Sequence, residues 1–156
     1  AKSKEASDAL IDYAKNKLKN SEVRALALSV LAVWFEEDIF YWATEIFSDT
    51  TEKTEMRLRA LDELVSFAKS RGESVANKTR RYLTDFTTAE ETSNEVFSNV
   101  VYYLGRAEEL GNVEMTRFLR AKKTWYNDNE LYERDRIIGE VLSGMLTPIN
   151  PGSVNN

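Results

Sequence analysis

A group of acidic residues supplies the side chains that a metal site or acid–base chemistry would need. It consists of the run Glu36, Glu37 and Asp38, followed by Glu45. If residues 23–47 form one continuous helix, Asp38 and Glu45 share a face of it. That spacing suits two metal ligands, but the Glu-x-x-His pattern of di-iron helical bundles needs histidine, and the chain has none. A carboxylate-based metal protein or enzyme at Asp38 and Glu45 is therefore the second alternative function. The competing interpretation is a solvated turn or bend that directs these acids outward.

Histidine and cysteine are both absent from the 156 residues. Their absence excludes Ser-His-Asp and Cys-His catalysis, thiol nucleophiles, disulfide bonds and metal sites built on histidine. The sequence also has no glycine-rich phosphate loop and no calcium loop. We therefore expect no cofactor, assign no catalytic residue or metal ligand, and lean against an enzyme.

Two segments with excess positive charge form the main candidate site. Residues 67–86 and 113–126 each carry a net charge of +3, whereas the whole chain carries −5. Such segregation favours binding to an acidic protein or to a phosphate backbone. The alternative is intramolecular, with basic helices beside acidic ones joined by weak surface ion pairs. The residues assigned to partner binding are Lys78, Arg80, Arg81, Tyr82, Arg117, Arg120, Lys123 and Trp125.

The sequence leaves the surroundings of some side chains open. Lys122 lies among apolar residues, so its ammonium either pairs with a carboxylate such as Asp38 or Glu45, or lies on an aromatic ring, or reaches solvent along its own stem. Aromatic residues are dense over residues 34–42 and at residues 102–103. They either fill the core, which is the default, or form an exposed hot spot for a partner.

The elements that position these residues are predicted to be helices. Proline occurs only at positions 148 and 151, and apolar residues recur at three- and four-residue spacings. We predict an all-α, single-domain bundle of about six or seven helices. A long and almost entirely apolar helix over residues 23–47, bent near 36–38, is expected to lie at its centre.

Several helix ends are predicted from capping residues. Ser7 is expected to cap a first helix that extends to Leu18, and Gly72 and Gly111 to end the helices before them. A capping-box pattern over residues 88–91 predicts another helix start.

The helices are expected to form one domain over residues 1–146, followed by a flexible tail over residues 147–156. A weak similarity relates Leu10–Lys15 to Leu64–Lys69. It indicates either stacked helical hairpins or the resemblance that amphipathic helices share by construction.

These features together predict a non-enzymatic interaction factor. A charged N-terminus without an apolar run, no cysteine and no membrane-length apolar stretch favour the cytoplasm. We expect a helical factor of adaptor, inhibitor or immunity type that binds an acidic macromolecule through residues 67–86 and 113–126. The favoured partner is a protein. The first alternative is a nucleic-acid-binding accessory factor that uses the same basic helices.

Overall fold

The computed structural model describes residues 3–87 and 93–154, and these form eight α-helices and two short 3-10 helices without a β-strand. The predicted all-α class is confirmed, and the count is close to the expected six or seven. The chain divides into two units, residues 1–67 with 151–156 and residues 68–150. In the described part of the chain, no helix is both long enough and apolar enough to span a membrane.

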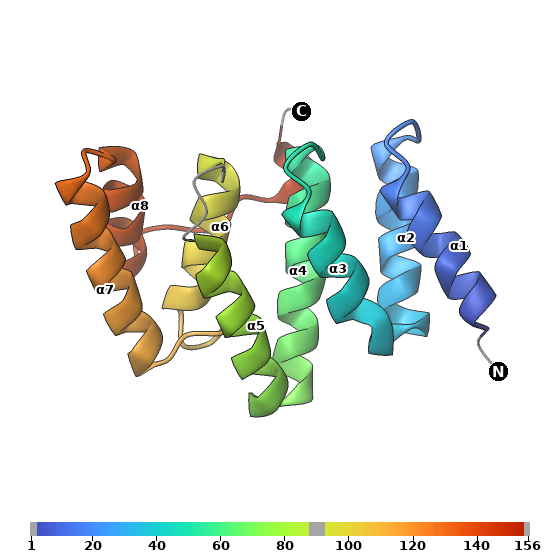
Figure 1. Ribbon diagram of the computed structural model, residues 1–156, viewed down its shortest axis with the longest axis horizontal. Coiled ribbons are helices and arrows are strands. Elements are labelled where there is room, and N and C mark those ends of the chain that lie inside the picture. The colour runs from blue at the N-terminus through green and yellow to red at the C-terminus, as the bar shows by residue number, and fades with distance from the viewer. Residues whose placement is uncertain (1–2, 88–92, 155–156) are drawn as a thin grey trace. The chain divides into compact units, whose positions relative to one another are not determined.

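The first unit is built from two helical hairpins (Figure 1). In the first hairpin, α1 packs against α2. The second hairpin follows after a short 3-10 helix, and its last helix continues into the second unit. The elements are α1 (Lys4–Lys15), α2 (Ser21–Trp34), η1 (Glu36–Asp38), α3 (Ile39–Ser48) and α4 (Thr54–Arg71).

The helix predicted over residues 23–47 is not continuous, and it is interrupted close to the bend predicted near residues 36–38. Helix α2 ends at Trp34, and Phe35 leaves the helical region with φ −134° and ψ 46°. The acids of η1 then immediately precede α3, where negative charge is favourable beside the helix N-terminus. Asp38 also accepts a hydrogen bond from the Ser7 hydroxyl at 3.2 Å. This contact joins residues 31 positions apart, so periodicity along the helix could not reveal it.

The first helix begins earlier and ends sooner than the sequence predicted. Its N-cap is Ser3, whose hydroxyl accepts from the Ala6 amide at 3.1 Å, and Ser7 is buried inside the helix. The helix ends at Lys15, because the Asn16 side chain turns the chain by accepting from the Leu18 amide at 3.0 Å. Leu18 is then 95% exposed and contributes nothing to the core.

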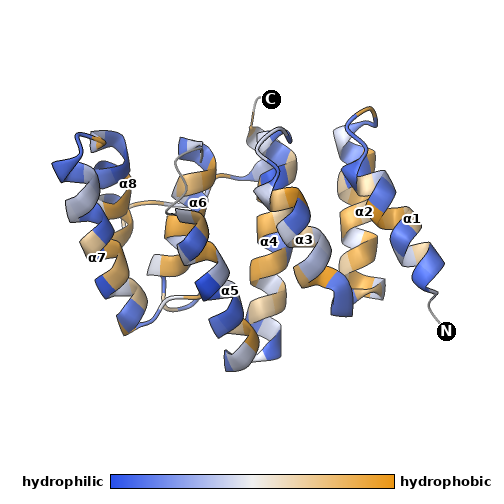
Figure 2. Ribbon diagram, in the orientation of Figure 1, coloured by the Kyte–Doolittle hydropathy of each residue, from blue (hydrophilic) through white to orange (hydrophobic). Residues whose placement is uncertain are grey.

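Helix α2 is apolar on two sides but buried on only one, so the expectation of a surrounded central helix is wrong. Figure 2 shows most of α2 as hydrophobic. Leu28 and Leu31 are buried, whereas Leu26 and Val33 are 63% and 72% exposed. The aromatic residues near α2 divide in the same way: Trp42 is fully buried, and Trp34, Tyr41 and part of Phe40 are accessible.

The two hairpins of the first unit are copies of one pattern, displaced by 33 residues. Arg24 in α2 and Arg57 in α4 each donate from Nε, at 2.8 Å, to the carbonyl ten residues earlier, at the end of the preceding helix. The similarity predicted between Leu10–Lys15 and Leu64–Lys69 is not this repeat, because it matches the first helix of one hairpin with the second helix of another. The matching residues are Glu22 and Glu55, Arg24 and Arg57, Ala27 and Ala60, Leu28 and Leu61, and Leu31 and Leu64.

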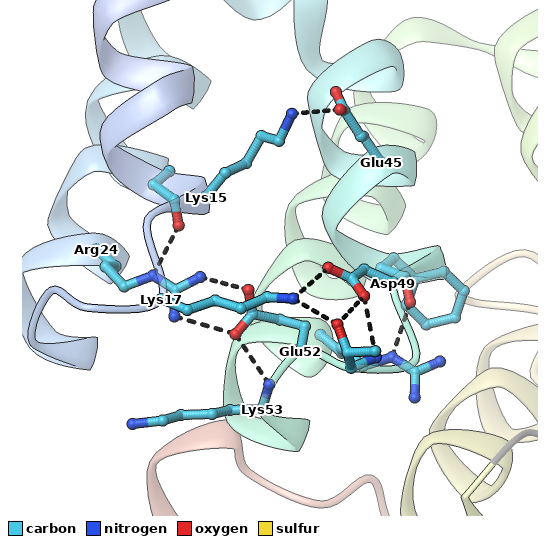
Figure 3. Close-up of polar contacts among 11 residues, drawn as sticks. Lys15, Lys17, Arg24, Glu45, Asp49, Glu52 and Lys53 are labelled. Carbon is cyan, nitrogen blue, oxygen red and sulfur yellow. Dashed lines mark hydrogen bonds and ion pairs between the residues drawn. The ribbon is translucent and has the colours of Figure 1, made fainter.

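Ion pairs join the two hairpins of the first unit (Figure 3). The buried pair is Arg24 with Glu52, in which the two guanidinium nitrogens donate to the two carboxylate oxygens at 3.0 and 2.5 Å. Both side chains are almost completely inaccessible. Two partly exposed pairs flank it, Lys15 with Glu45 and Lys17 with Asp49.

Asp49 gives the first unit a pH dependence that can be measured. Hydrogen bonds from Thr51 and then from Lys17 lower the pKa of Asp49 from 3.8 to about 2. A lowered pKa contributes stability above pH 3.8, and this contribution is lost as the pH falls towards 2. We expect Asp49→Asn to lower the melting temperature by about 1–3 °C at pH 7 and to have no effect near pH 2. Thermal melts from pH 2 to 7 check this, with Asp12→Asn as the charge-matched control. A deficit that does not shrink below pH 4 would contradict it.

The second unit contains the remaining α-helices. Helix α6 packs against α5, α7 and α8, and α7 packs against α8. Gly72, at φ +89°, ends α4 as predicted. Helix α6 was expected to close at Gly111 but ends at Gly105, because a turn over residues 106–110 intervenes. The predicted capping box over residues 88–91 lies outside the described residues. The elements are α5 (Glu73–Thr87), α6 (Asn94–Gly105), α7 (Val113–Asp128) and α8 (Tyr132–Leu142); η2 (Pro151–Ser153) follows in the first unit.

The second helix of every hairpin buries the same three positions. The apolar part of the pattern therefore recurs in α6 and α8, although the interval between hairpins varies. These positions are Ala27, Leu28 and Leu31 in α2, Ala60, Leu61 and Leu64 in α4, Val100, Val101 and Leu104 in α6, and Ile137, Ile138 and Val141 in α8.

Helix α6 carries Phe97 at the position that holds Arg24 in α2. The carbonyl ten residues earlier, that of Thr87, accepts instead from the Tyr126 hydroxyl at 2.7 Å. Tyr126 packs edge-on against Phe97 at 5.5 Å between ring centroids. Phe97 and Tyr126 thus take the place of the arginine, and the Tyr126 hydroxyl supplies the hydrogen bond to the carbonyl at the end of α5.

Candidate interaction surface

Helices α5 and α7 carry predicted basic residues at equivalent positions along their lengths. The chain runs in the same direction through both helices (Figure 1), and the Tyr126–Thr87 bond sets a 39-residue register between them. The same interval relates Lys78 to Arg117 and Arg81 to Arg120. All four side chains are exposed. These four residues are called the basic face below.

The arginines of the basic face are not neutralised within the second unit. In the described part of the chain, Arg81, Arg117 and Arg120 have no carboxylate within ion-pair distance, whereas many other cations do, Lys69 and Arg136 among them. The internal explanation of the charge segregation therefore does not account for these three residues.

Arg80 does not belong to the exposed surface on which the sequence placed it. It is only 5% exposed, and its guanidinium donates to the Leu110 carbonyl at 3.2 Å and also to Asn77 and Glu73. Its equivalent at the 39-residue interval is Leu119, which is also buried. The position faces the core in both helices, so Arg80 acts as a structural residue there.

Lys123 and Trp125 of the predicted surface are partly used inside the second unit. Lys123 pairs with Asp135 at 2.6 Å and lowers the pKa of that carboxyl below its usual range. Trp125 is 48% exposed, and the Lys122 ammonium lies 5.3 Å from its ring centroid. Lys122 thus lies on an aromatic ring, one of the alternatives expected from the sequence, and needs no acidic partner. Tyr82 is half-buried.

Asp38 lies in η1, directly before α3, and Glu45 lies inside α3. Asp38 is exposed and bonded to Ser7, while Glu45 is paired with Lys15. Among the described residues, no group of three or more acidic side chains lies where it could hold a metal ion.

Protein-family models, curated proteins and solved structures gave no match to this chain.

The basic face has the chemistry of an anion-binding surface. Guanidinium groups stay charged at every physiological pH and can bind a carboxylate or phosphate through two parallel N–H bonds. A helix surface also presents residues three apart side by side, so Lys78 and Arg81 are neighbours on α5, and Arg117 and Arg120 are neighbours on α7. Sequence reasoning named the residues of the basic face for partner binding but did not identify the hairpin repeat of the first unit. The recurrence of Glu-x-Arg-x-x-Ala-Leu-x-x-Leu at residues 22–31 and 55–64 was the available signal.

Proposed function

We propose that this chain is a non-enzymatic helical-hairpin repeat protein of the cytoplasm that binds an acidic protein through the basic face of α5 and α7. The observation that carries the proposal is the set of three exposed arginines without an internal carboxylate partner among the described residues. Repeats of this kind stack equivalent helices and so present rows of equivalent side chains to a partner. A row of guanidinium groups steers an acidic surface to the protein and fixes its register.

A protein partner is favoured over nucleic acid by the charge of the whole chain. The net charge is −5, so a long phosphate backbone would meet repulsion outside the basic face. A folded acidic partner can limit its contact to the basic face alone.

The test compares two full-length triple variants that change the net charge equally. R81E/R117E/R120E reverses the arginines of the basic face. K4E/K19E/K53E reverses three exposed lysines of the first unit and is the matched control. Each protein is immobilised and exposed to an extract of the cells that naturally make this chain. The proteins that it captures are quantified by mass spectrometry. The wild type and the control should retain the same acidic protein, and the basic-face variant should lose it.

Affinity for that captured protein, once purified, should fall about 100-fold in the basic-face variant, because several like charges are then brought together. Identical capture by all three proteins would contradict the proposal. Capture that disappears on nuclease treatment, with gel shifts that weaken steeply as salt rises, would replace it by the nucleic-acid alternative.

A further inference from the structure

A buried asparagine in α6 holds the C-terminal segment of the second unit by its backbone. Asn99 is fully inaccessible, its Nδ2 donates to the Ile149 carbonyl at 3.0 Å, and its Oδ1 accepts from the Ile149 amide at 2.8 Å. One side-chain amide therefore satisfies both polar backbone groups of a residue 50 positions away. The segment over residues 145–150 has no helix of its own.

The other hairpins do not have asparagine at the position equivalent to Asn99. The residue two before the middle buried position is Leu26 in α2, Arg59 in α4 and Arg136 in α8. A buried amide is costly unless it is hydrogen-bonded, so the asparagine of α6 is explained by the chain that it binds. Both of its bonds go to backbone atoms, and such recognition does not depend on the side chain of the bound residue.

The bound segment forms one side of a groove whose other sides belong to α6 and α8. Leu146 and Ile149 line this groove together with Ser98 of α6 and Ile137 of α8. Both segment side chains are only half-buried, whereas Ile137 is 3% exposed. Because both apolar side chains of the segment stay partly exposed, we expect it to open without unfolding the helices.

The groove also restricts the chemistry of what it can accept. Its charged residues are Glu95, Glu133 and Arg136, and Arg136 is already paired with Glu133 and Glu140. The groove is therefore slightly acidic and disfavours an acidic occupant. Pro148 keeps the preceding residue of the bound segment extended, which suits backbone recognition.

We propose that α6 and α8 form a binding site for an extended, non-acidic peptide segment of a partner protein, and that residues 146–149 occupy this site in the same chain until the partner displaces them. The preferred segment carries two apolar residues three apart, as Leu146 and Ile149 are, with a proline between them. The site is independent of the basic face, and either can fail experimentally without the other.

The first test uses a fluorescent peptide with the sequence of residues 144–152 and the full chain carrying L146D/I149D, which releases the segment. This variant should bind the peptide saturably. The wild type should bind it at least about tenfold more weakly, because its own segment must open first. Adding Asn99→Leu to the released variant should abolish binding, and a peptide with serine at both apolar positions should not bind. A released variant that keeps its circular dichroism spectrum but does not bind the peptide would overturn the proposal.

The second test needs no released variant. Hydrogen exchange on the wild-type chain should show a protected Ile149 amide, and excess peptide should speed its exchange while amides in α6 stay protected. Asn99→Leu should remove the protection at Ile149 without the peptide. An Ile149 amide that exchanges as fast as an unstructured one in the wild type, or that excess peptide leaves unchanged, would also overturn the proposal.

Discussion

Replacing Glu52 by glutamine should lower the free energy of unfolding by about 3–5 kcal/mol, the typical cost of removing one partner from a buried ion pair. Arg24 would keep its charge at a site with no access to water, and its bond to the Ala14 carbonyl cannot neutralise it. Urea denaturation of the wild type and the variant measures the difference.

The control is Glu45→Gln, which removes the partner of Lys15 from the partly exposed pair between the same hairpins. It should cost about 1 kcal/mol or less, since solvent screens that pair. The double variant R24M/E52L should recover most of the stability lost in Glu52→Gln, because replacing a buried pair by apolar side chains is often close to neutral. Equal losses in Glu52→Gln and Glu45→Gln would mean that the Arg24–Glu52 pair is accessible to water in solution.

Leu28→Ala should destabilise the protein by about 2–5 kcal/mol, since Leu28 is 1% exposed and its truncation leaves a cavity. Leu61→Ala, at the equivalent position of the next hairpin, should cost a similar amount. Thermal and urea unfolding measure both.

Leu26→Ala is the matched control on the same helix and should change stability by less than about 0.5 kcal/mol, because Leu26 is 63% exposed. A loss as large as that of Leu28→Ala, growing with protein concentration, would instead show that the outer side of α2 is covered by a second copy of the chain in solution.

The residue pattern predicted the elements well wherever local interactions decide the outcome. The stripe Leu61, Leu64, Val65 and Ala68 lies on one buried face of α4, and Gly72 stops that helix. Helix periodicity and the special backbone freedom of glycine act within a few residues, so the sequence alone carries them. The tail over residues 147–156 and the single domain over residues 1–146 stay predictions.

The repeat was also present in the sequence, although only a comparison at the 33-residue interval reveals it. The similarity between Leu10–Lys15 and Leu64–Lys69 misled because apolar spacing is common to all amphipathic helices. Glu-x-Arg ahead of the apolar stripe is more specific, since its arginine bonds the end of the preceding helix in both hairpins of the first unit.

Whether a charged or polar side chain is exposed was decided only by the tertiary structure. Arg80 and Arg81 are neighbours in sequence, yet Arg80 is bonded to the Leu110 carbonyl 30 residues away and Arg81 is exposed. Asn99 likewise depends on Ile149, and the break after α2 is accompanied by the contact between Ser7 and Asp38. Composition, periodicity and capping residues determined that this chain forms helices and which face of most of them is buried. Contacts between residues distant in sequence decided which arginines of the described chain have no ion-pair partner, because only the folded chain sets the distances between charges.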